Sequence, residues 1–180
     1  MAKAVFLDRD GTINIDTGYL SHPEELELFP GAAEGLRLLQ DAGFFLIVVT
    51  NQSGIARGYL NEKTLSLIHE KMDELLKPHG VSILEYLYCP EHPDSNPIRR
   101  KPHPTMLLEA AKRHDLLLGE SYMIGDRLTD LQAGIAAGCR GQIMVQTGLG
   151  QKERPTVNSE ASFFASDLLN AAQWICSREV

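Results

Sequence analysis

The sequence predicts a three-layer α/β fold, in which helices cover both faces of a central parallel sheet. Apolar runs of strand length recur along the 180 residues, and segments with apolar residues at helical spacing separate them. Several runs are followed at once by polar residues, as buried parallel strands are at the ligand-binding edge of an open sheet. With 43% hydrophobic residues, this length suits one well-buried core, so we expect residues 1–180 to form a single domain.

The first predicted strand is the apolar run Val5-Phe6-Leu7, which ends in Asp8-Arg9-Asp10-Gly11-Thr12. Asp8 falls at the carboxyl end of this strand, and Gly11 lets the chain turn directly behind the two carboxylates. Asp8 and Asp10 can therefore face the same ligand, and such a pair suits a hard cation, a nucleophile and a general acid. An Asp-Gly turn that simply closes a strand is the alternative for this stretch taken alone.

The next part of the chain again shows an apolar strand that is followed by a polar cluster. Residues 13–29 are expected to form a polar loop, and a helix opened by Pro30-Gly31 then runs to Gly43. Residues 44–49 form the second predicted strand, which ends in Thr50-Asn51-Gln52-Ser53-Gly54. Polar side chains from two strand ends are thereby expected at the same edge of the sheet.

The second half of the chain continues the alternation of strands and helices. Its predicted elements are a helix capped by Asn61 and ended by Pro78-His79-Gly80, a strand over 83–88, a loop over 89–101, a helix from about Pro104 to His114, a short strand over 122–124, a helix from Leu128 to Ala137 closed by Gly138, a strand over 142–146, and a last helix from the cap Asp167 to about Cys176. The short strand delivers Gly125-Asp126 to the edge that already holds Asp8.

The composition restricts the class of partner. The formal net charge of -7 argues against the basic stripe that nucleic acids require and favours a small substrate held by a few local cations. No segment approaches the length of a membrane span, and Lys3 is followed by a strand rather than by a signal peptide. Three widely spaced cysteines, Cys89, Cys139 and Cys176, fit reduced thiols. We therefore expect a soluble cytoplasmic monomer with no nucleic-acid or membrane partner.

Four strand ends supply the groups that phosphoryl transfer needs, namely a nucleophile, cations over the phosphoryl oxygens and a proton source. These groups lie in the motifs Asp8-Arg9-Asp10-Gly11-Thr12, Thr50-Asn51, Lys101-Pro102 and Gly125-Asp126-Arg127-Leu128-Thr129-Asp130. In this order the motifs resemble the four-motif signature of the haloacid-dehalogenase superfamily of phosphatases, and the match covers roughly residues 3–150. The resemblance implies the Rossmann-like fold of that superfamily. The chain has no insertion long enough for a separate cap domain.

Two longer segments, residues 49–58 and 100–104, resemble the D-glycero-D-manno-heptose-1,7-bisphosphate 7-phosphatases, whose near relatives are histidinol phosphatases. The resemblance implies that Asp8 is the nucleophile that forms an aspartyl-phosphate, and that Asp10 is the acid for the sugar oxygen and then the base for water. It also implies that Mg2+ binds Asp8, the backbone carbonyl of Asp10, and Asp126. A hard cation there would offset the repulsion between an anionic nucleophile and a phosphoester. Asp126 could alternatively be a helix cap.

The same resemblance implies the residues that bind the substrate. Thr50 and Lys101 are expected to hold the transferring phosphoryl group, and Arg100 the second phosphate, which a guanidinium can bind bidentately. Arg127 stands where relatives carry a substrate-contacting lysine. The full expected set is Asp16, Thr17, Gly18, Tyr19, Asn51, Gln52, Ser53, Arg100, Lys101 and Arg127. The alternatives are a solvated surface role for Lys101 and a loop without function at Asp16-Thr17-Gly18-Tyr19.

The loop after the third strand departs from the family pattern. Many of these phosphatases hold this loop with a zinc ion bound by a Cys-x-His pair and a Cys-x-Cys pair. Here Cys89 is followed by Glu91 at the partner position and by His92 one place further on, and the segment before Arg100 contains no cysteine. Two ligands cannot close a tetrahedral site. We therefore expect Mg2+ as the cofactor and no zinc.

The leading hypothesis is a Mg2+-dependent phosphatase that removes the 7-phosphate of D-glycero-D-manno-heptose 1,7-bisphosphate in nucleotide-activated heptose synthesis for the lipopolysaccharide core. A phosphatase of histidinol phosphate or of another small phosphomonoester is the alternative within the same class. A phospho-accepting signalling module, as in receiver domains, is the alternative from a different class. Asp10 favours an enzyme, because an acid two residues after the nucleophile serves turnover.

Overall fold

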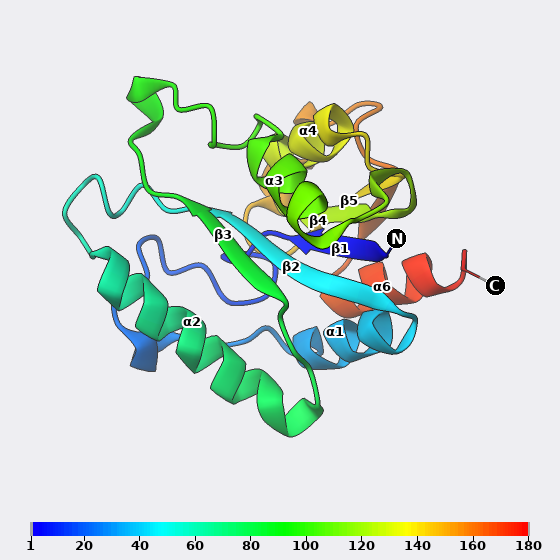
Figure 1. The fold of residues 1–180 in the computed structure, drawn as a ribbon, viewed down its shortest axis with the longest axis horizontal. Helices are drawn as coiled ribbons and strands as arrows, with labels where there is room; N and C mark the ends of the chain where they lie inside the picture. Colours follow the sequence, from blue (N-terminus) through cyan, green and yellow to red (C-terminus); the bar gives the residue numbers. More distant parts are fainter. Residues whose placement is uncertain (1, 180) are drawn as a thin grey trace.

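The computed structural model describes residues 2–179 and contains a six-stranded sheet in which every pairing is parallel (Figure 1). The strands are β1 (Lys3–Leu7), β2 (Phe44–Asn51), β3 (Glu85–Cys89), β4 (Tyr122–Gly125), β5 (Gly141–Val145) and β6 (Phe163–Ala165), in the spatial order β3-β2-β1-β4-β5-β6. The chain builds outward from β1 in one direction and then crosses over to build outward from β4 in the other. The predicted α/β fold class is confirmed.

The helices form one layer on each face of the sheet (Figure 1). They are α1 (Ala32–Asp41), α2 (Glu62–Leu76), α3 (Thr105–His114), α4 (Leu128–Ala137), α5 (Gly150–Glu153) and α6 (Leu168–Cys176). Helices α1, α2 and α6 cover one face, and α3 and α4 cover the other. The connections between neighbouring parallel strands therefore run through helices, as parallel pairing requires.

Strand β1 lies in the middle of the sheet because both of its faces are apolar. Val5 and Leu7 pack in the core with α1, α2 and α6, whereas Ala4 and Phe6 pack in the core with α3 and α4. All four side chains are 0% exposed, so the strand buries a continuous apolar run rather than an alternating one. This position puts Asp8 at the switch point between β1 and β4, where the order of the strands reverses.

Local end signals set the helix boundaries where the sequence predicted them. The side chain of Asn61 accepts from the backbone N–H of Thr64 at 2.8 Å, and α2 begins at the next residue. Asp167 caps α6 in the same way, and Gly138 ends α4 with a φ of +83°. The three-residue strand β6 was not predicted, because a segment this short carries no apolar period and is extended through its pairing with β5. Among residues 2–179, no helix has both the length and the apolar character that crossing a membrane requires.

Gly35 is expected to be essential for the contact between α1 and α6. An alanine in a helix interior normally stabilises it by about 0.5–1 kcal/mol relative to glycine. A Cβ at Gly35 would instead lie 2.9 Å from the carbonyl oxygen of Leu168 and from the Cα of Leu169, and this backbone has to shift. Gly35→Ala should therefore lower the free energy of unfolding by about 1–3 kcal/mol in urea titrations. Gly119→Ala, where a Cβ meets nothing within 4 Å, is the control, and equal stability of the two variants would contradict the prediction.

Candidate active site

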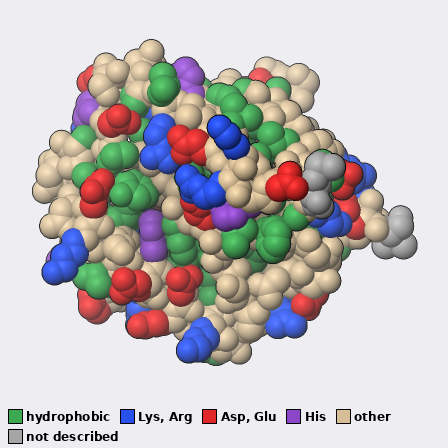
Figure 2. Space-filling view, viewed as in Figure 1, with side chains coloured by type: hydrophobic (Ala, Val, Ile, Leu, Met, Phe, Trp, Pro, Cys, Tyr) green, Lys and Arg blue, Asp and Glu red, His purple; other side chains and the backbone are tan. Residues whose placement is uncertain are grey.

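The carboxyl ends of β1, β2 and β4 open into a cleft of about 640 Å3, which the loop between β3 and α3 borders on one side. The predicted site residues that line it are Asp8, Asp10, Gly18, Tyr19, Thr50, Asn51, Gln52, Ser53, Arg100, Lys101 and Arg127. Figure 2 shows acidic and basic side chains interspersed over the face that it presents, without a continuous basic stripe.

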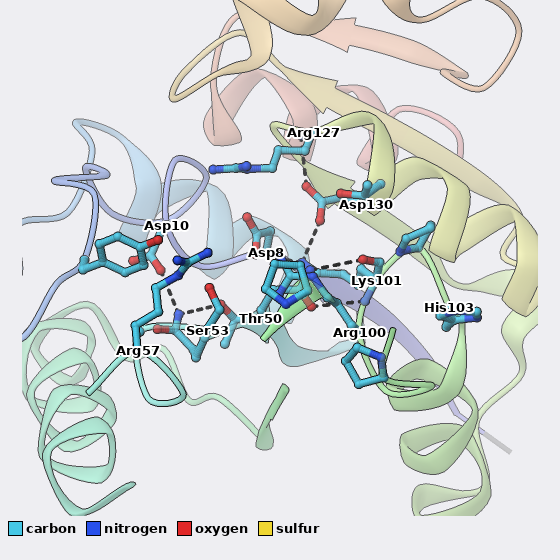
Figure 3. Close-up of a pocket in the computed structure, with 18 of the residues that line it drawn as sticks. Asp8, Asp10, Thr50, Ser53, Arg57, Arg100, Lys101, His103, Arg127 and Asp130 are labelled. Carbon is cyan, nitrogen blue, oxygen red and sulfur yellow. Dashed lines mark hydrogen bonds and ion pairs between the residues drawn. The ribbon is translucent and has the colours of Figure 1, made fainter. Parts of the chain in front are cut away.

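Lys101 lies between two carboxylates on the floor of the cleft (Figure 3). Its ammonium is 2.8 Å from Oδ1 of Asp8 and 2.6 Å from Oδ1 of Asp130, and it donates to the carbonyl oxygen of Val49 at 2.7 Å. Burial alone would lower the pKa of Lys101, but the carboxylates of Asp130 and Asp8 outweigh it and raise this pKa above its usual value. The side chain is 2% exposed, so Lys101 is a buried cation rather than a solvated surface lysine.

Asn51 holds the loop that carries Lys101. Its amide nitrogen donates to the carbonyl oxygen of Lys101 at 3.2 Å, and its amide oxygen accepts from the backbone N–H of Lys101 at 3.1 Å. This reciprocal pair connects the end of β2 to the loop between β3 and α3. Asn51 thereby fixes the position of the Lys101 backbone, from which the ammonium reaches the cleft.

Asp126 is fully buried beneath the cleft, and one of its oxygens has no hydrogen-bond partner. Oδ2 accepts from the backbone N–H of Leu149 at 2.8 Å, whereas Oδ1 is buried and unpartnered. Burial, reinforced by the charges of Asp8 and Asp130, raises the pKa of Asp126 to about 9. Oxygens of these three carboxylates lie within 4.8 Å of one another. A hard divalent cation fits this oxygen-only set, and it would satisfy the unpartnered Oδ1.

The predicted metal ligands Asp8 and Asp126 are thus brought together, and the structure adds Asp130 to their cluster. The Asp130 carboxylate also accepts from the backbone N–H of Arg127 at 3.0 Å, at the start of α4. Because Lys101 and this N–H already bind Asp130, its main part in the cluster is to hold Lys101 in place. In the sequence, Asp130 belongs to the motif that follows the fourth predicted strand, but it is not among the expected metal ligands.

The carboxylate of Asp10 accepts four N–H donors. Arg9 Nε at 3.1 Å and Asn14 Nδ2 at 2.9 Å donate to Oδ1, and Arg9 Nη2 and Gln52 Nε2, both at 2.9 Å, donate to Oδ2. Burial by itself would raise the pKa of Asp10, but Arg9 and these hydrogen bonds hold it below its usual value. In this conformer Asp10 is therefore a carboxylate held in position by three residues, Arg9, Asn14 and Gln52.

Gln52 connects the first two motifs. Its amide nitrogen donates to Oδ2 of Asp10 and to the hydroxyl oxygen of Thr50, in both cases at 2.9 Å. Both hydrogens of this amide are thereby used within the protein. Gln52 lines the cleft as predicted, but its nitrogen orients Asp10 and Thr50, so its carbonyl oxygen is the atom left to meet a ligand.

Three guanidinium groups, those of Arg57, Arg100 and Arg127, border the cleft. Burial and the charges of Arg127 and Arg57 lower the pKa of Arg100, and its Nη1 is buried without a hydrogen-bond partner. Arg127 lies 3.8 Å from the carboxylate of Asp16. An anion at the rim would satisfy Arg100 and reduce the repulsion among the three cations. Arg57, which lies 5.8 Å above the ring of Tyr19, was not predicted to line the site. Its positive charge within residues 49–58, a segment that resembles the family, could have indicated this role.

Two residues of the predicted substrate loop lie outside the cleft lining. Asp16 accepts from the backbone N–H of Gly18 at 2.8 Å and faces Arg127, so it shapes the loop and orients a residue that lines the cleft. Thr17 is exposed. The two potential zinc ligands already have protein partners, because the thiol of Cys89 donates to Glu91 at 3.2 Å and Nδ1 of His92 accepts from the backbone N–H of Asp94 at 3.2 Å.

The loop after β5 supports Asp126, although none of its residues is among the predicted site residues. Besides the contact from Leu149, the hydroxyl of Thr147 donates to the carbonyl oxygen of Gly11 at 2.7 Å. A Cβ at Gly11 or at Gly148 would overlap with Oδ2 of Asp126, and both glycines have positive φ. The sequence Thr147-Gly148-Leu149-Gly150 directly after a predicted strand could have indicated a loop at the site. It does so only once β5 and β1 are known to end at the same edge of the sheet.

Mg2+ is expected to stabilise the folded protein through Asp126. At a concentration of 100 times its dissociation constant, a cation that binds only the folded state adds about 2.7 kcal/mol to the free energy of unfolding. Asp126→Asn should abolish this gain while the protein remains folded. Thermal melts of both proteins with Mg2+ and with chelator measure it, and an undiminished gain in the variant would exclude Asp126 as a ligand.

The raised pKa of Asp126 also predicts how the metal-free protein responds to pH. Since this pKa rises from 3.8 to about 9 on folding, the folded protein holds a proton that the unfolded chain has released. The stabilisation is present below the unfolded value, and it is lost as the pH rises through the folded value. In chelator, the free energy of unfolding should therefore fall between about pH 4 and about pH 9. Asp126→Asn should flatten this slope, and an unchanged slope in urea titrations would assign it to another group.

Known proteins resemble this chain in sequence and in structure. Residues 98–171 match the family model described as HAD-hydrolase-like. The D-glycero-D-manno-heptose-1,7-bisphosphate 7-phosphatase of Thermosynechococcus vestitus is 40% identical over 188 residues, which cover 97% of this chain and 95% of that protein. The D-glycero-beta-D-manno-heptose-1,7-bisphosphate 7-phosphatase of Escherichia coli K12 is 40% identical over 185 residues, which cover 97% of this chain and 90% of that protein.

The solved structures give the same result. The D,D-heptose 1,7-bisphosphate phosphatase of B. bronchiseptica, complexed with magnesium and phosphate, superposes with a TM-score of 0.91 at 35% identity and covers 98% of this chain and 99% of its own. The enzyme of that name from Burkholderia thailandensis superposes with a TM-score of 0.75 at 32% identity, over 97% and 99% of the two chains. The resemblance that the four motifs indicated is confirmed, and the chain belongs to the D-glycero-D-manno-heptose-1,7-bisphosphate 7-phosphatase family of haloacid-dehalogenase-like hydrolases.

Proposed function

We propose that this protein is a Mg2+-dependent phosphatase that removes the 7-phosphate of D-glycero-D-manno-heptose 1,7-bisphosphate through an aspartyl-phosphate intermediate. The observation that carries the proposal is the placement of Asp8 between the ammonium of Lys101 and the unpartnered carboxylate oxygen of Asp126. A nucleophile, a fixed cation and a carboxylate oxygen that suits a hard metal thereby meet at one point. The names of the relatives and of the superposed structures support the choice of substrate.

In the first step Asp8 attacks the phosphorus atom of the 7-phosphate. Lys101 binds Oδ1 of Asp8, so we assign the attack to Oδ2. An O–P bond forms to Asp8, the bond between phosphorus and the sugar oxygen breaks, and Asp10 gives its proton to that oxygen. Bound Mg2+, held by Asp8, Asp126 and the backbone carbonyl of Asp10, would neutralise charge on the phosphoryl oxygens. Lys101 and the hydroxyl of Thr50 bind the same oxygens from the protein side.

In the second step Asp10 acts as the base. It takes a proton from the water that attacks the phosphorus of the aspartyl-phosphate, which releases phosphate and restores the carboxylate of Asp8. The conformer seen in the structure, with four donors on the carboxylate of Asp10, fits the ionised form that Asp10 has between the two steps. For the next turnover, the carboxyl group, which now holds the proton taken from water, must turn from these donors towards the sugar oxygen.

The rim of the cleft supports a bisphosphate as the substrate. The unpartnered Nη1 of Arg100 lies beyond the reaction centre, on the same loop as Lys101, and it fits the phosphate that is not transferred. We propose that Gly18, Tyr19, Asn51, Gln52, Ser53 and Arg127 complete the walls, and that Asp16 and Thr17 shape the loop beside them. In a single domain with no cap, these loops select the substrate.

The proposed setting concerns the class of partner, the oligomeric state and the compartment. A net charge of -7 supports a small-molecule substrate rather than nucleic acid. We also propose a monomer that acts in the cytoplasm without a membrane partner. The enzyme would serve nucleotide-activated heptose synthesis for the lipopolysaccharide core. We also propose that it needs no zinc, because Cys89 and His92 are the two potential ligands in the loop that carries zinc in relatives.

A comparison of substrates tests the proposed function. Values of kcat/KM should be highest for an anomer of the heptose bisphosphate, lower for histidinol phosphate and for an aryl phosphate, and close to zero for all of them without Mg2+. Equal values for the bisphosphate and for histidinol phosphate would contradict the assigned substrate. Activity that persists in chelator would contradict the assigned cofactor.

Arg100 should serve the substrate and not the reaction. Arg100→Ala is expected to lower kcat/KM for the bisphosphate by about 2 kcal/mol of transition-state free energy, the scale of a charge-assisted hydrogen bond. Hydrolysis of an aryl monophosphate should barely change. Lys101→Ala is the comparison, because every substrate presents a transferring phosphoryl group and both activities should fall. A parallel loss on both substrates in Arg100→Ala would assign Arg100 to the reaction centre or to the loop.

A further inference from the structure

Arg9, between the two aspartates of the first motif, is a buried cation for which the reaction described above has no use. It is 0% exposed and is the largest fully buried side chain among residues 2–179. An ionised guanidinium in such a place needs partners on its nitrogens, because an unpaired buried charge is costly. Two partners are present, Asp10 on one side and His69 of α2 on the other.

The pairing of Arg9 with Asp10 is bidentate. Nε lies 3.1 Å from Oδ1, and Nη2 lies 2.9 Å from Oδ2. A fork of this kind fixes the plane of the carboxylate as well as its distance, which a single point charge would not do. Arg9 supplies two of the four donors to Asp10, so the orientation of this carboxylate depends in large part on the orientation of the guanidinium.

His69 fixes the far end of that guanidinium. Its Nε2 lies 3.2 Å from Nη1 of Arg9, and only a neutral ring with a lone pair on Nε2 can accept from Arg9. Burial and the neighbouring Arg9 charge support the neutral form, because they lower the pKa of His69 to about 3. The ring stacks on Tyr86 of β3 at 4.3 Å with an interplanar angle of 11°, so α2 and β3 hold it from both sides.

We propose that Arg9 and His69 are positioning residues for Asp10, in which His69 orients the guanidinium of Arg9 and Arg9 orients the carboxylate that exchanges the proton. The inference rests on the proposed role of Asp10 as the acid and base. When Asp10 turns to the sugar oxygen, Arg9 stays on His69 and marks the place to which the carboxylate returns for the second step. Two elements that do not line the cleft, α2 and β3, thereby help to orient the group that transfers the proton.

A matched pair of variants at His69 isolates this role. His69→Phe keeps a ring against Tyr86 and removes the acceptor for Arg9, whereas His69→Gln supplies an amide oxygen as acceptor and gives up the ring. The readout is the ratio of kcat for a sugar or alkyl phosphate, whose leaving group needs a proton, to kcat for 4-nitrophenyl phosphate, whose leaving group needs little. Arg9→Lys is the second test, because it keeps the charge and loses the fork, and it decides the question if His69→Phe does not fold.

His69→Phe should lower this ratio about tenfold, a part of the 10²- to 10⁴-fold that general acid catalysis contributes, and His69→Gln should restore most of it. Leu76→Ala is the control, because it leaves a cavity under the same helix without removing a contact to Arg9. It should lower the free energy of unfolding and leave the ratio unchanged. Equal losses on both substrates in His69→Phe and Arg9→Lys would overturn the proposal. If Asp10→Asn itself lost both activities equally, the acid role of Asp10 would fall, and the inference with it. A lowered ratio in Asp10→Asn with an unchanged ratio in His69→Phe and Arg9→Lys would overturn the inference alone.

Discussion

The buried ammonium of Lys101 is the interaction on which the site depends. Asp8, Asp126 and Asp130 bring three carboxylates within 4.8 Å of one another, and such a cluster repels itself in a low dielectric. Lys101 binds two of the three, and removal of one member of a buried ion pair typically costs about 3–5 kcal/mol. The third, Asp126, has an oxygen left over, which fits a divalent metal. The cluster thus combines a fixed cation, the ammonium of Lys101, with an oxygen that suits a second, exchangeable cation, the divalent metal.

The topology of the sheet explains how these groups meet. Asp8 and Asp126 follow the neighbouring strands β1 and β4, and Thr50 ends β2 on the other side of β1, so parallel pairing alone delivers them to one edge. Lys101 is different, because it arrives on a loop beyond β3, and Asn51 must pin that loop to the end of β2. The fixed floor therefore comes from the sheet, while the walls come from loops that can differ between relatives.

The features that sequence could predict are those with local causes. The buried runs of β1 and β2, the cap at Asn61 and the glycine at 138 each act within a few residues, and the motif aspartates stand where strands end. The rest depends on contacts across the fold. No periodic pattern in the sequence predicts the contacts that Asn14 and Arg9 make with Asp10, that Leu149 makes with Asp126, or that the neutral His69 makes with Arg9. The three-residue strand β6 is likewise formed through its pairing with β5. Of these, Arg9 looks in the sequence like an exposed charge and is fully buried.

The central claim is that the carboxylate placed beside Lys101, and not another acid of the cluster, receives the phosphoryl group. Reduction of an acyl phosphate with borohydride converts the aspartate to homoserine, which peptide mass spectrometry locates. The Asp10→Asn variant suits this experiment, because water attacks its intermediate slowly. When borohydride is added while this variant reacts with an aryl phosphate and Mg2+, we expect homoserine at Asp8. We expect none without Mg2+ or with Asp8→Asn. Homoserine at Asp126 or Asp130, or an unmodified chain in a reacting sample, would contradict the account.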